Sequence, residues 1–319
     1  MAEENYTPDL DSYSLEKAKV ELFETPDKRI GSVQALKEWA MQQPWLKTPT
    51  DTHFLLSMLR ARKFSQLGAR ELLVNYWTKQ MESPEWFVGA DPGSEESLQI
   101  LRAGPTLVPL PGRDKYGRRI LLFKVGNLDT SEKFYNTASY IRAFHFLGDR
   151  LLLDEKTQVN GIVLLADFMD VTLKQQLWLG VDNLRKVLKY LQKSVPVRLK
   201  ELHFFNLGPF FDAIFATIKS FLSEKLRSRV FIHSRGLVTV YNHVDMSMLP
   251  SEYLPDEYQG PLAGTLQDIM ETFIQKEYQD PKTLLFIREL HSGRYGVDLS
   301  KKPKIGDEMV ASFRKLSVD

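Results

Sequence analysis

The feature that most constrains the fold is a repeated change of hydrophobic period from residue 119 onward. Residues 120–125, 160–168 and 197–204 are short apolar runs of the kind that form strands. Residues 134–153 and 174–193, which lie between them, repeat apolar side chains at helical spacing. Strands that alternate with helices of this length predict an α/β domain with a largely parallel sheet.

The N-terminal part of the chain has helical patterns without strands between them. Residues 1–48 are charged and are interrupted by prolines. One helix is predicted after a cap at Thr50 or Asp51, and a second over residues 67–81. A stretch rich in Gly, Pro and Ser follows, over residues 88–112. We therefore predict a helical region over residues 1–88, an α/β domain over 89–290 and a C-terminal tail over 291–319.

Composition excludes several classes of function. The chain has 42 Lys and Arg against 41 Asp and Glu, so it lacks the overall positive field of a general nucleic-acid binder. It has no Cys, which excludes disulfides, thiolate metal sites and cysteine nucleophiles. The six His do not occur at metal-binding spacing, and the nucleophile-elbow, P-loop and dinucleotide-binding motifs are all missing from the sequence. We expect neither a catalytic centre, nor a metal site, nor a cofactor.

The sequence predicts neither a signal peptide nor a membrane-spanning helix, and we therefore expect a cytoplasmic protein. Residues 1–15 have neither the basic nor the apolar segment of a signal peptide. The most apolar stretch, residues 202–222, contains Asp212 and Lys219, whereas a spanning helix needs about 20 apolar residues with few charges. We expect this stretch to touch a membrane surface at most.

The helix predicted over residues 209–222 is unusually aromatic. At helical spacing its apolar side chains form one broad stripe, while Asp212, Lys219 and Ser220 lie on the other side. Gly208-Pro209 provides a start at which the missing N–H of proline costs nothing. The stripe is either an ordinary buried face or a movable lid whose Phe side chains enter a membrane interface.

Positive charge gathers on both sides of this helix in the sequence. The strand predicted before it places Arg198 and Lys200 on one face, and Lys225, Arg227 and Arg229 follow it. Such residues commonly form a solvated surface. Beside an aromatic stripe they also suit an anionic membrane, where each cation contributes on the order of 1 kcal/mol.

Four segments, in order, resemble the CRAL-TRIO, or Sec14-like, family. They are residues 51–64 (DTHFLLSMLRARKF), 160–168 (NGIVLLADF), 194–206 (SVPVRLKELHFFN) and 215–233. Within the family the chain looks most similar to the group of the α-tocopherol transfer protein and the cellular retinaldehyde-binding protein. The resemblance implies an N-terminal helical CRAL-TRIO-N region and a Sec14-like α/β lipid-binding domain. A mobile helical gate at about residues 206–225 would close the lipid pocket.

The resemblance also implies three sets of site residues. The gate and membrane-insertion residues are Phe210, Phe211, Ile214, Phe215, Ile218 and Leu222. The phosphoinositide-binding residues are Arg62, Arg198, Lys200, Lys225 and Arg229. The lipid-pocket residues are Ile141, Phe144, Gly148, Ile162, Leu164, Ala166, Val187, Tyr190, Leu191, Val195 and Val197. Gly148 stands where the tocopherol carrier has Ser, and Ala166 stands where it has Phe. These two differences leave open a ligand other than tocopherol. The Tyr190 phenol would then replace the polar contact of the missing Ser.

These observations predict a non-enzymatic carrier of one small hydrophobic molecule, such as a tocopherol, retinoid, carotenoid or other isoprenoid. Its partners would be that ligand and a phosphoinositide-containing membrane surface, with no nucleic acid. The alternative with the same fold is a Sec14-like phosphatidylinositol or phospholipid exchanger or sensor. A lipid esterase and a passive interaction scaffold are further alternatives, and the sequence does not decide the oligomeric state.

Overall fold

The computed structural model describes residues 6–133, 135–208, 211–233 and 237–303, apart from the side chains of residues 176, 213 and 214. The helices of its N-terminal part are α1 (Ser12–Leu22), α2 (Pro26–Met41), α3 (Thr52–Ala61) and α4 (Gln66–Glu82). The remaining helices are α5 (Glu95–Arg102), α6 (Thr137–Leu153), α7 (Glu155–Asn160), α8 (Leu173–Trp178), α9 (Gly180–Lys193), α10 (Phe211–Phe221), α11 (Glu224–Arg227), α12 (Leu266–Phe273) and α13 (Pro281–Leu290). Short 3₁₀ turns lie at 84–86, 125–127, 246–248 and 251–253, and a π-helical turn at 274–278 continues α12.

The N-terminal helices form one packed unit. Asp51 caps α3 by accepting a hydrogen bond from the Phe54 N–H at 2.9 Å, as the sequence predicts. Leu22, Leu36, Leu55 and other apolar side chains from all four helices pack together without solvent exposure. Burial of these faces against one another is what stabilises the unit.

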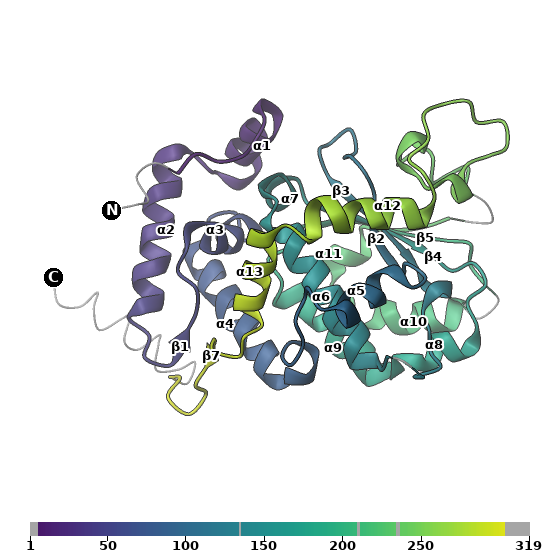
Figure 1. Ribbon diagram of the computed structural model, residues 1–319. Helices are drawn as coiled ribbons and strands as arrows, with labels where there is room; N and C mark the ends of the chain where they lie inside the picture. The colour runs from purple at the N-terminus through teal and green to yellow at the C-terminus, as the bar shows by residue number, and fades with distance from the viewer. Residues whose placement is uncertain (1–5, 134, 209–210, 234–236, 304–319) are drawn as a thin grey trace.

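Part of the C-terminal tail belongs to this N-terminal unit. Strand β1 (Leu46–Lys47) pairs antiparallel with β7 (Gly296–Val297). Leu290 and Val297 are buried in the same cluster as the N-terminal helices. In Figure 1 the yellow end of the described chain returns beside the purple N-terminal helices. Residues up to 303 are therefore tied to the body of the protein through this strand pair.

The α/β part is built on a five-stranded sheet with the order β2-β3-β4-β5-β6. Its strands are β2 (Leu107–Pro109), β3 (Arg119–Lys124), β4 (Ile162–Asp167), β5 (Leu199–Phe205) and β6 (Val230–Ile232). All neighbours are parallel except β2, which runs antiparallel to β3 at one edge. The α/β class with a largely parallel sheet is therefore confirmed. The two short edge strands are too brief to give a sequence signal.

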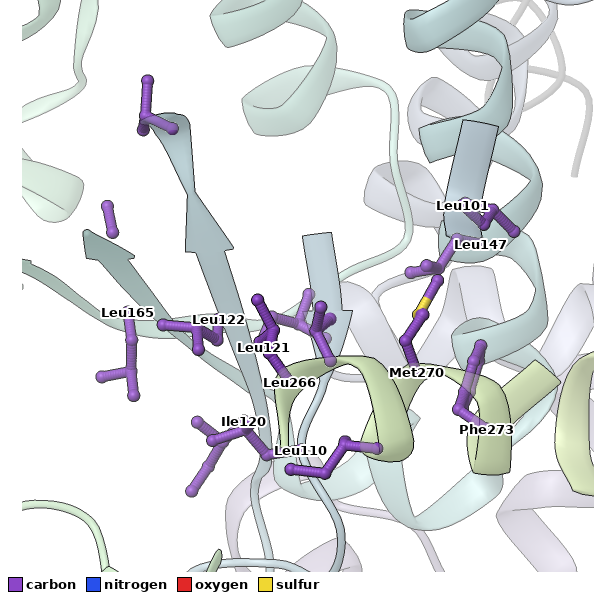
Figure 2. Packing of buried hydrophobic residues seen from close by; sticks show 14 of the residues in the cluster. Leu101, Leu110, Ile120, Leu121, Leu122, Leu147, Leu165, Leu266, Met270 and Phe273 are labelled. Carbon is purple, nitrogen blue, oxygen red and sulfur yellow. The ribbon is translucent and has the colours of Figure 1, made fainter. Parts of the chain in front are cut away.

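Helices cover the sheet and join it to the N-terminal unit. Helix α12 packs against the edge strand β2 and against α5, and α8, α9 and α10 lie below the strands in the view of Figure 1. Figure 2 shows Leu266 of α12 beside Leu121 of β3. Met270, one turn further along α12, points toward Leu101 of α5 and Leu147 of α6. These contacts belong to the main apolar core.

The helix predicted over residues 174–193 is wrong in one respect, because the chain forms two helices there. The helices α8 and α9 meet at Leu179, and Gly180 has a φ of +71°. A left-handed residue interrupts the helical path, and glycine adopts it without a Cβ penalty. Among the described helices, none is both long and apolar enough to cross a bilayer.

Candidate functional site

One face of the sheet carries a row of two phenylalanines and one alanine, which forms the floor of the candidate site. Phe123 of β3, Ala166 of β4 and Phe204 of β5 lie side by side in register. Phe144 of α6 meets Phe123 edge-on with ring centroids 6.2 Å apart. On the other side, Phe211 of α10 lies 5.8 Å from the Phe204 ring. The helices α6 and α10 therefore form two walls above one floor.

The described side chains do not fill the space beside α6. Leu164 lies on the central strand and is nevertheless only partly buried. Gly148 lies one helical turn after Phe144, on the same face of α6, and a Cβ added there would meet no atom of the described residues within 4 Å. The described residues therefore leave open space beside Gly148, next to Phe144 on α6.

Helix α9 gives the second sign of an open apolar site. It is strongly amphipathic, yet Tyr190 is its only buried residue. Leu184, Val187 and Leu188 are half-buried, and Val181 is 54% exposed. An apolar helix face normally packs against a core. The face of α9 therefore suits a partner that the described residues do not supply.

The predicted pocket residues fall into two neighbouring clusters rather than one lining. The first surrounds Trp86 and Phe87 and contains Ile141, Val187, Tyr190 and Val195. The second is the main core, with Phe144, Ile162, Leu164, Ala166 and Val197. Gly148 borders the open space, and Leu191 is 41% exposed on the surface of α9. The assignment of all eleven residues to one lipid pocket remains a prediction.

Tyr190 lies between the N-terminal unit and the α/β part. Its ring is 5.4 Å from Phe87 and 4.8 Å from His145. Burial, and next the charge of Asp149, raise the pKa of the Tyr190 phenol well above its usual value. The phenol is therefore neutral and can serve as a hydrogen-bond donor to an uncharged ligand.

The predicted gate helix is closed against the floor. Phe211 is 2% exposed and contacts Phe168 at 5.1 Å and Phe215 at 5.3 Å between ring centroids. Leu222 is also buried, whereas Ile218 is half-buried. Phe210 lies outside the described residues, as does the side chain of Ile214. In this conformation Phe211 faces inward, so contact between Phe211 and a membrane requires α10 to move.

A single glutamine links the end of this gate to α9. The Gln192 amide nitrogen donates to the Phe221 carbonyl at 3.0 Å. Its amide oxygen accepts from the Ser223 N–H at 2.7 Å. The Arg185 guanidinium also lies over the Phe221 ring, 5.0 Å from the centroid. The C-terminal end of α10 is thus held by few polar contacts, while its N-terminal end is held by aromatic packing.

The structure shows an exposed apolar row within the helical pattern predicted from the sequence. Leu177 and Val181 belong to the helical stripe predicted over residues 174–193, but Leu177 is 65% exposed. Leu173, one turn before Leu177, is also more than half exposed. The spacing of four residues marks the row, but spacing does not say whether the chain covers it. The row lies on α8 and at the start of α9, on the same side of the sheet as α10 (Figure 1).

The five predicted basic residues meet in one hollow of about 700 Å³. Arg62 ends α3, Arg198 and Lys200 lie at the start of β5, Lys225 is in α11 and Arg229 precedes β6. The starts of parallel strands share one edge of the sheet, which brings distant cations together. Lys63 and Glu21 also line the hollow, and the sequence reading had assigned neither of them to a site.

The hollow holds more positive than negative charge. The Arg198 guanidinium and the Lys200 ammonium both donate to the Glu21 carboxylate, at 2.8 and 3.2 Å. Within the described residues, Arg62 and Lys225 form no ion pair. Burial, and next the charge of Arg198, lower the pKa of Lys200 to about 8. Burial, followed by the neighbouring cations, also lowers the pKa of Lys225. An anion with several charges would relieve this repulsion.

The opposite face of the sheet brings together Glu201, His203 and His243, whose donor atoms lie within 4.8 Å of one another. Arg118 donates to both oxygens of Glu201, at 2.6 and 3.1 Å, so the carboxylate already has a cation. His203 Nδ1 lies 2.9 Å from His233 Nε2. The geometry favours a hydrogen-bonding network over a metal site. The cluster joins β5 to residues about 30 to 40 positions later, which spacing along the chain does not reveal.

Comparison with known proteins places this architecture in a family. The model of the CRAL/TRIO domain matches residues 105–253. The chain is 37% identical over 251 residues to the human protein named alpha-tocopherol transfer protein-like, covering 78% of this chain and 70% of that protein. It is 34% identical over 262 residues to human clavesin-2, covering 80% of this chain and 78% of that protein. The chain therefore belongs to the CRAL-TRIO family, whose members bind and transfer small hydrophobic ligands.

A solved structure entitled "Crystal structure of Sfh5" aligns with 89% of this chain and 98% of its own, at 12% identity and a TM-score of 0.48. This similarity is too distant to inform the site. Of the two relatives named above, the first carries the name of a transfer protein.

Proposed function

We propose that this protein carries one small hydrophobic molecule between α6, α9, α10 and the sheet, and delivers it to phosphoinositide-containing membranes. The observation that carries the proposal is the open space beside Gly148, together with the half-buried face of α9. The name of a 37% identical relative supports a ligand of the tocopherol class, and retinoids, carotenoids and other isoprenoids share its chemistry. No catalytic step is proposed.

Burial in this space is sufficient to bind such a ligand. Removing apolar area from water contributes roughly 25 cal/mol per Å², so some hundreds of Å² give tight binding without a charged contact. The same burial makes release slow in water. Delivery therefore requires the gate, α10, to open at the correct surface.

The gate and the basic hollow are adjacent, which supports coupling between them. Helix α10 is followed directly by α11, which carries Lys225 into the hollow. A phosphoinositide headgroup bound in the hollow would contact Lys225 and thereby change the position of this connection. The residues that hold the headgroup would be Arg62, Arg198, Lys200, Lys225 and Arg229. The exposed leucines of α8 would enter the lipid surface first, and Phe211 would follow once α10 leaves the floor. The protein would act in the cytoplasm and associate peripherally with membranes.

The experiment fills the open space and measures ligand binding. In Gly148→Phe a large side chain occupies the space beside α6, so we expect the affinity for a fluorescent isoprenoid to fall at least tenfold. Gly31 of α2 is the control, because it is a helical glycine on the exposed surface, where an added side chain meets no atom within 4 Å and touches no proposed site residue. Gly31→Phe is expected to bind like the wild type. Equal binding by both variants contradicts the assigned space.

A second candidate, a phosphatidylinositol exchanger or sensor, is favoured by one observation. The basic hollow is lined by Leu191 and Val197 as well as by cations, so it suits a charged headgroup attached to an apolar chain. Competition of the fluorescent ligand by phosphatidylinositol, but not by isoprenoids, would support this candidate instead.

A further inference from the structure

We infer that Glu21 is a built-in competitor for the basic hollow, so that a polyanionic headgroup must displace this carboxylate before it can contact Arg198 and Lys200. The inference rests on the proposed function and names how its anion site is regulated. Glu21 belongs to α1, far from the other lining residues in sequence. None of the residue sets predicted from the sequence contains it.

The contacts place the Glu21 carboxylate where an anion would bind. It accepts hydrogen bonds from Arg198 at 2.8 Å and from Lys200 at 3.2 Å. The Glu21 side chain is 39% exposed, whereas those of Arg198 and Lys200 are 10% and 19% exposed. The carboxylate is therefore accessible from solvent, while its two partners are largely covered. An incoming anion reaches the cations by taking the place of Glu21.

Helix α1 does not depend on Glu21 to stay docked. Ala18 and Leu22 of α1 are buried in the N-terminal core. The Ser14 hydroxyl accepts a hydrogen bond from the Asn160 amide at 2.8 Å, away from the hollow. Arg198 also keeps a second contact, since it donates to the Val159 carbonyl. Exchange of Glu21 for a neutral residue should therefore leave the hollow in place and its two cations free.

The charges in the hollow explain why displacement favours a polyanion. An anion with one charge merely exchanges with Glu21, and the number of ion pairs hardly changes. An anion with several charges also reaches Arg62 and Lys225, which form no ion pair within the described residues. Pairs in a solvent-accessible hollow are individually weak, so the competitor changes affinity several-fold rather than by orders of magnitude.

The test compares Glu21→Gln with Glu16→Gln in the full chain. Glu16 is an exposed residue of the same helix, so the second variant has the same net charge and reports non-specific attraction. Binding is measured to phosphatidylcholine vesicles with and without phosphatidylinositol bisphosphate. We expect Glu21→Gln to bind the phosphoinositide vesicles about three- to tenfold more tightly than the wild type, and Glu16→Gln to be unchanged. Thermal unfolding of each variant confirms that both are folded.

Two further arms separate the possible results. Calorimetry with soluble inositol trisphosphate shows whether the gain belongs to headgroup recognition, and a matching gain there supports the inference. Glu21→Asp keeps the charge on a shorter side chain and should fall between the wild type and Glu21→Gln. If the wild type binds and Glu21→Gln binds equally or more weakly, the inference is wrong and the proposed function stands. If neither binds, the proposed function is wrong, and the inference with it.

Discussion

Helices α3 and α9 are both amphipathic in sequence, yet they end in opposite environments. Seven consecutive residues of α3, from Phe54 to Arg60, are buried. In the longer α9, Tyr190 is the only buried residue. The partners of α3 are other helices of the chain. The described residues cover the apolar face of α9 only in part, which is what we expect of a wall of the proposed ligand site.

In the core around α3, the buried arginine also has its hydrogen-bond partners. Arg60 is fully buried and donates to Glu24 at 2.8 and 2.9 Å and to Gln158 at 2.8 Å. A buried guanidinium is stable only when it is paired in this way. The chain itself therefore completes the core around α3, whereas the described residues cover the apolar face of α9 only in part.

The largest expected effect breaks this comparison directly. Leu55→Ala in α3 removes a fully buried side chain and should lower the free energy of unfolding by about 2–5 kcal/mol. Leu188→Ala in α9 removes a half-buried side chain and should cost less than about 1 kcal/mol in the ligand-free protein. Urea unfolding of both variants measures the difference. Equal losses would show that α9 packs against a filled core.

The second prediction concerns the basic hollow rather than the apolar site beside α9. Each cation near an anionic surface contributes on the order of 1 kcal/mol, so the double variant Arg198→Ala, Lys225→Ala should lose about 2 kcal/mol, or about thirtyfold, in affinity for phosphoinositide vesicles. The double variant Lys189→Ala, Lys193→Ala removes two exposed cations of α9 outside the hollow. We expect it to lose little in the same vesicle-sedimentation assay. An equal loss in both would assign binding to overall charge.

The smallest expected effect tests whether the face of the sheet opposite the floor is packed as completely as the core around α3. His203 is buried there, and burial lowers its pKa from 6.5 to about 4. The folded state therefore disfavours protonation, so stability is full above pH 6.5 and falls as the pH drops through the window from 6.5 to 4. We expect His203 to contribute about 1 kcal/mol to the loss of stability between pH 7 and pH 5.5, so the loss should be smaller by about that amount in His203→Gln. Denaturant unfolding at the two pH values measures this loss of stability in each protein. An equal loss in the wild type and in His203→Gln would contradict the prediction.

Periodicity predicts the elements of this fold well because it records burial on one side of an element. The strands around Leu121, Leu164 and Leu202 and the caps of α3 follow from local chemistry. Periodicity misses the break at Gly180, since one left-handed residue leaves the apolar spacing of its neighbours intact. It also does not reveal that Leu177 is exposed.

The basic part of the candidate site was predictable from the sequence. Charge patterning marks Arg198, Lys200, Lys225 and Arg229, and the resemblance adds Arg62, which the fold brings to the same hollow. Glu21 had no such signal, because its role depends on how α1 docks against β5. The open space beside Gly148 depends on packing in three dimensions and has no pattern along the chain.

The central claim is that the space beside α6 and α9 holds a hydrophobic ligand. Native mass spectrometry of the purified protein, followed by organic extraction and identification of what is released, tests it most directly. The account predicts one isoprenoid-class molecule per chain in the wild type and in Gly31→Phe, and a strongly reduced amount in Gly148→Phe. Absence of any bound lipid in the wild type, together with failure to bind a panel of lipophilic compounds, would contradict it.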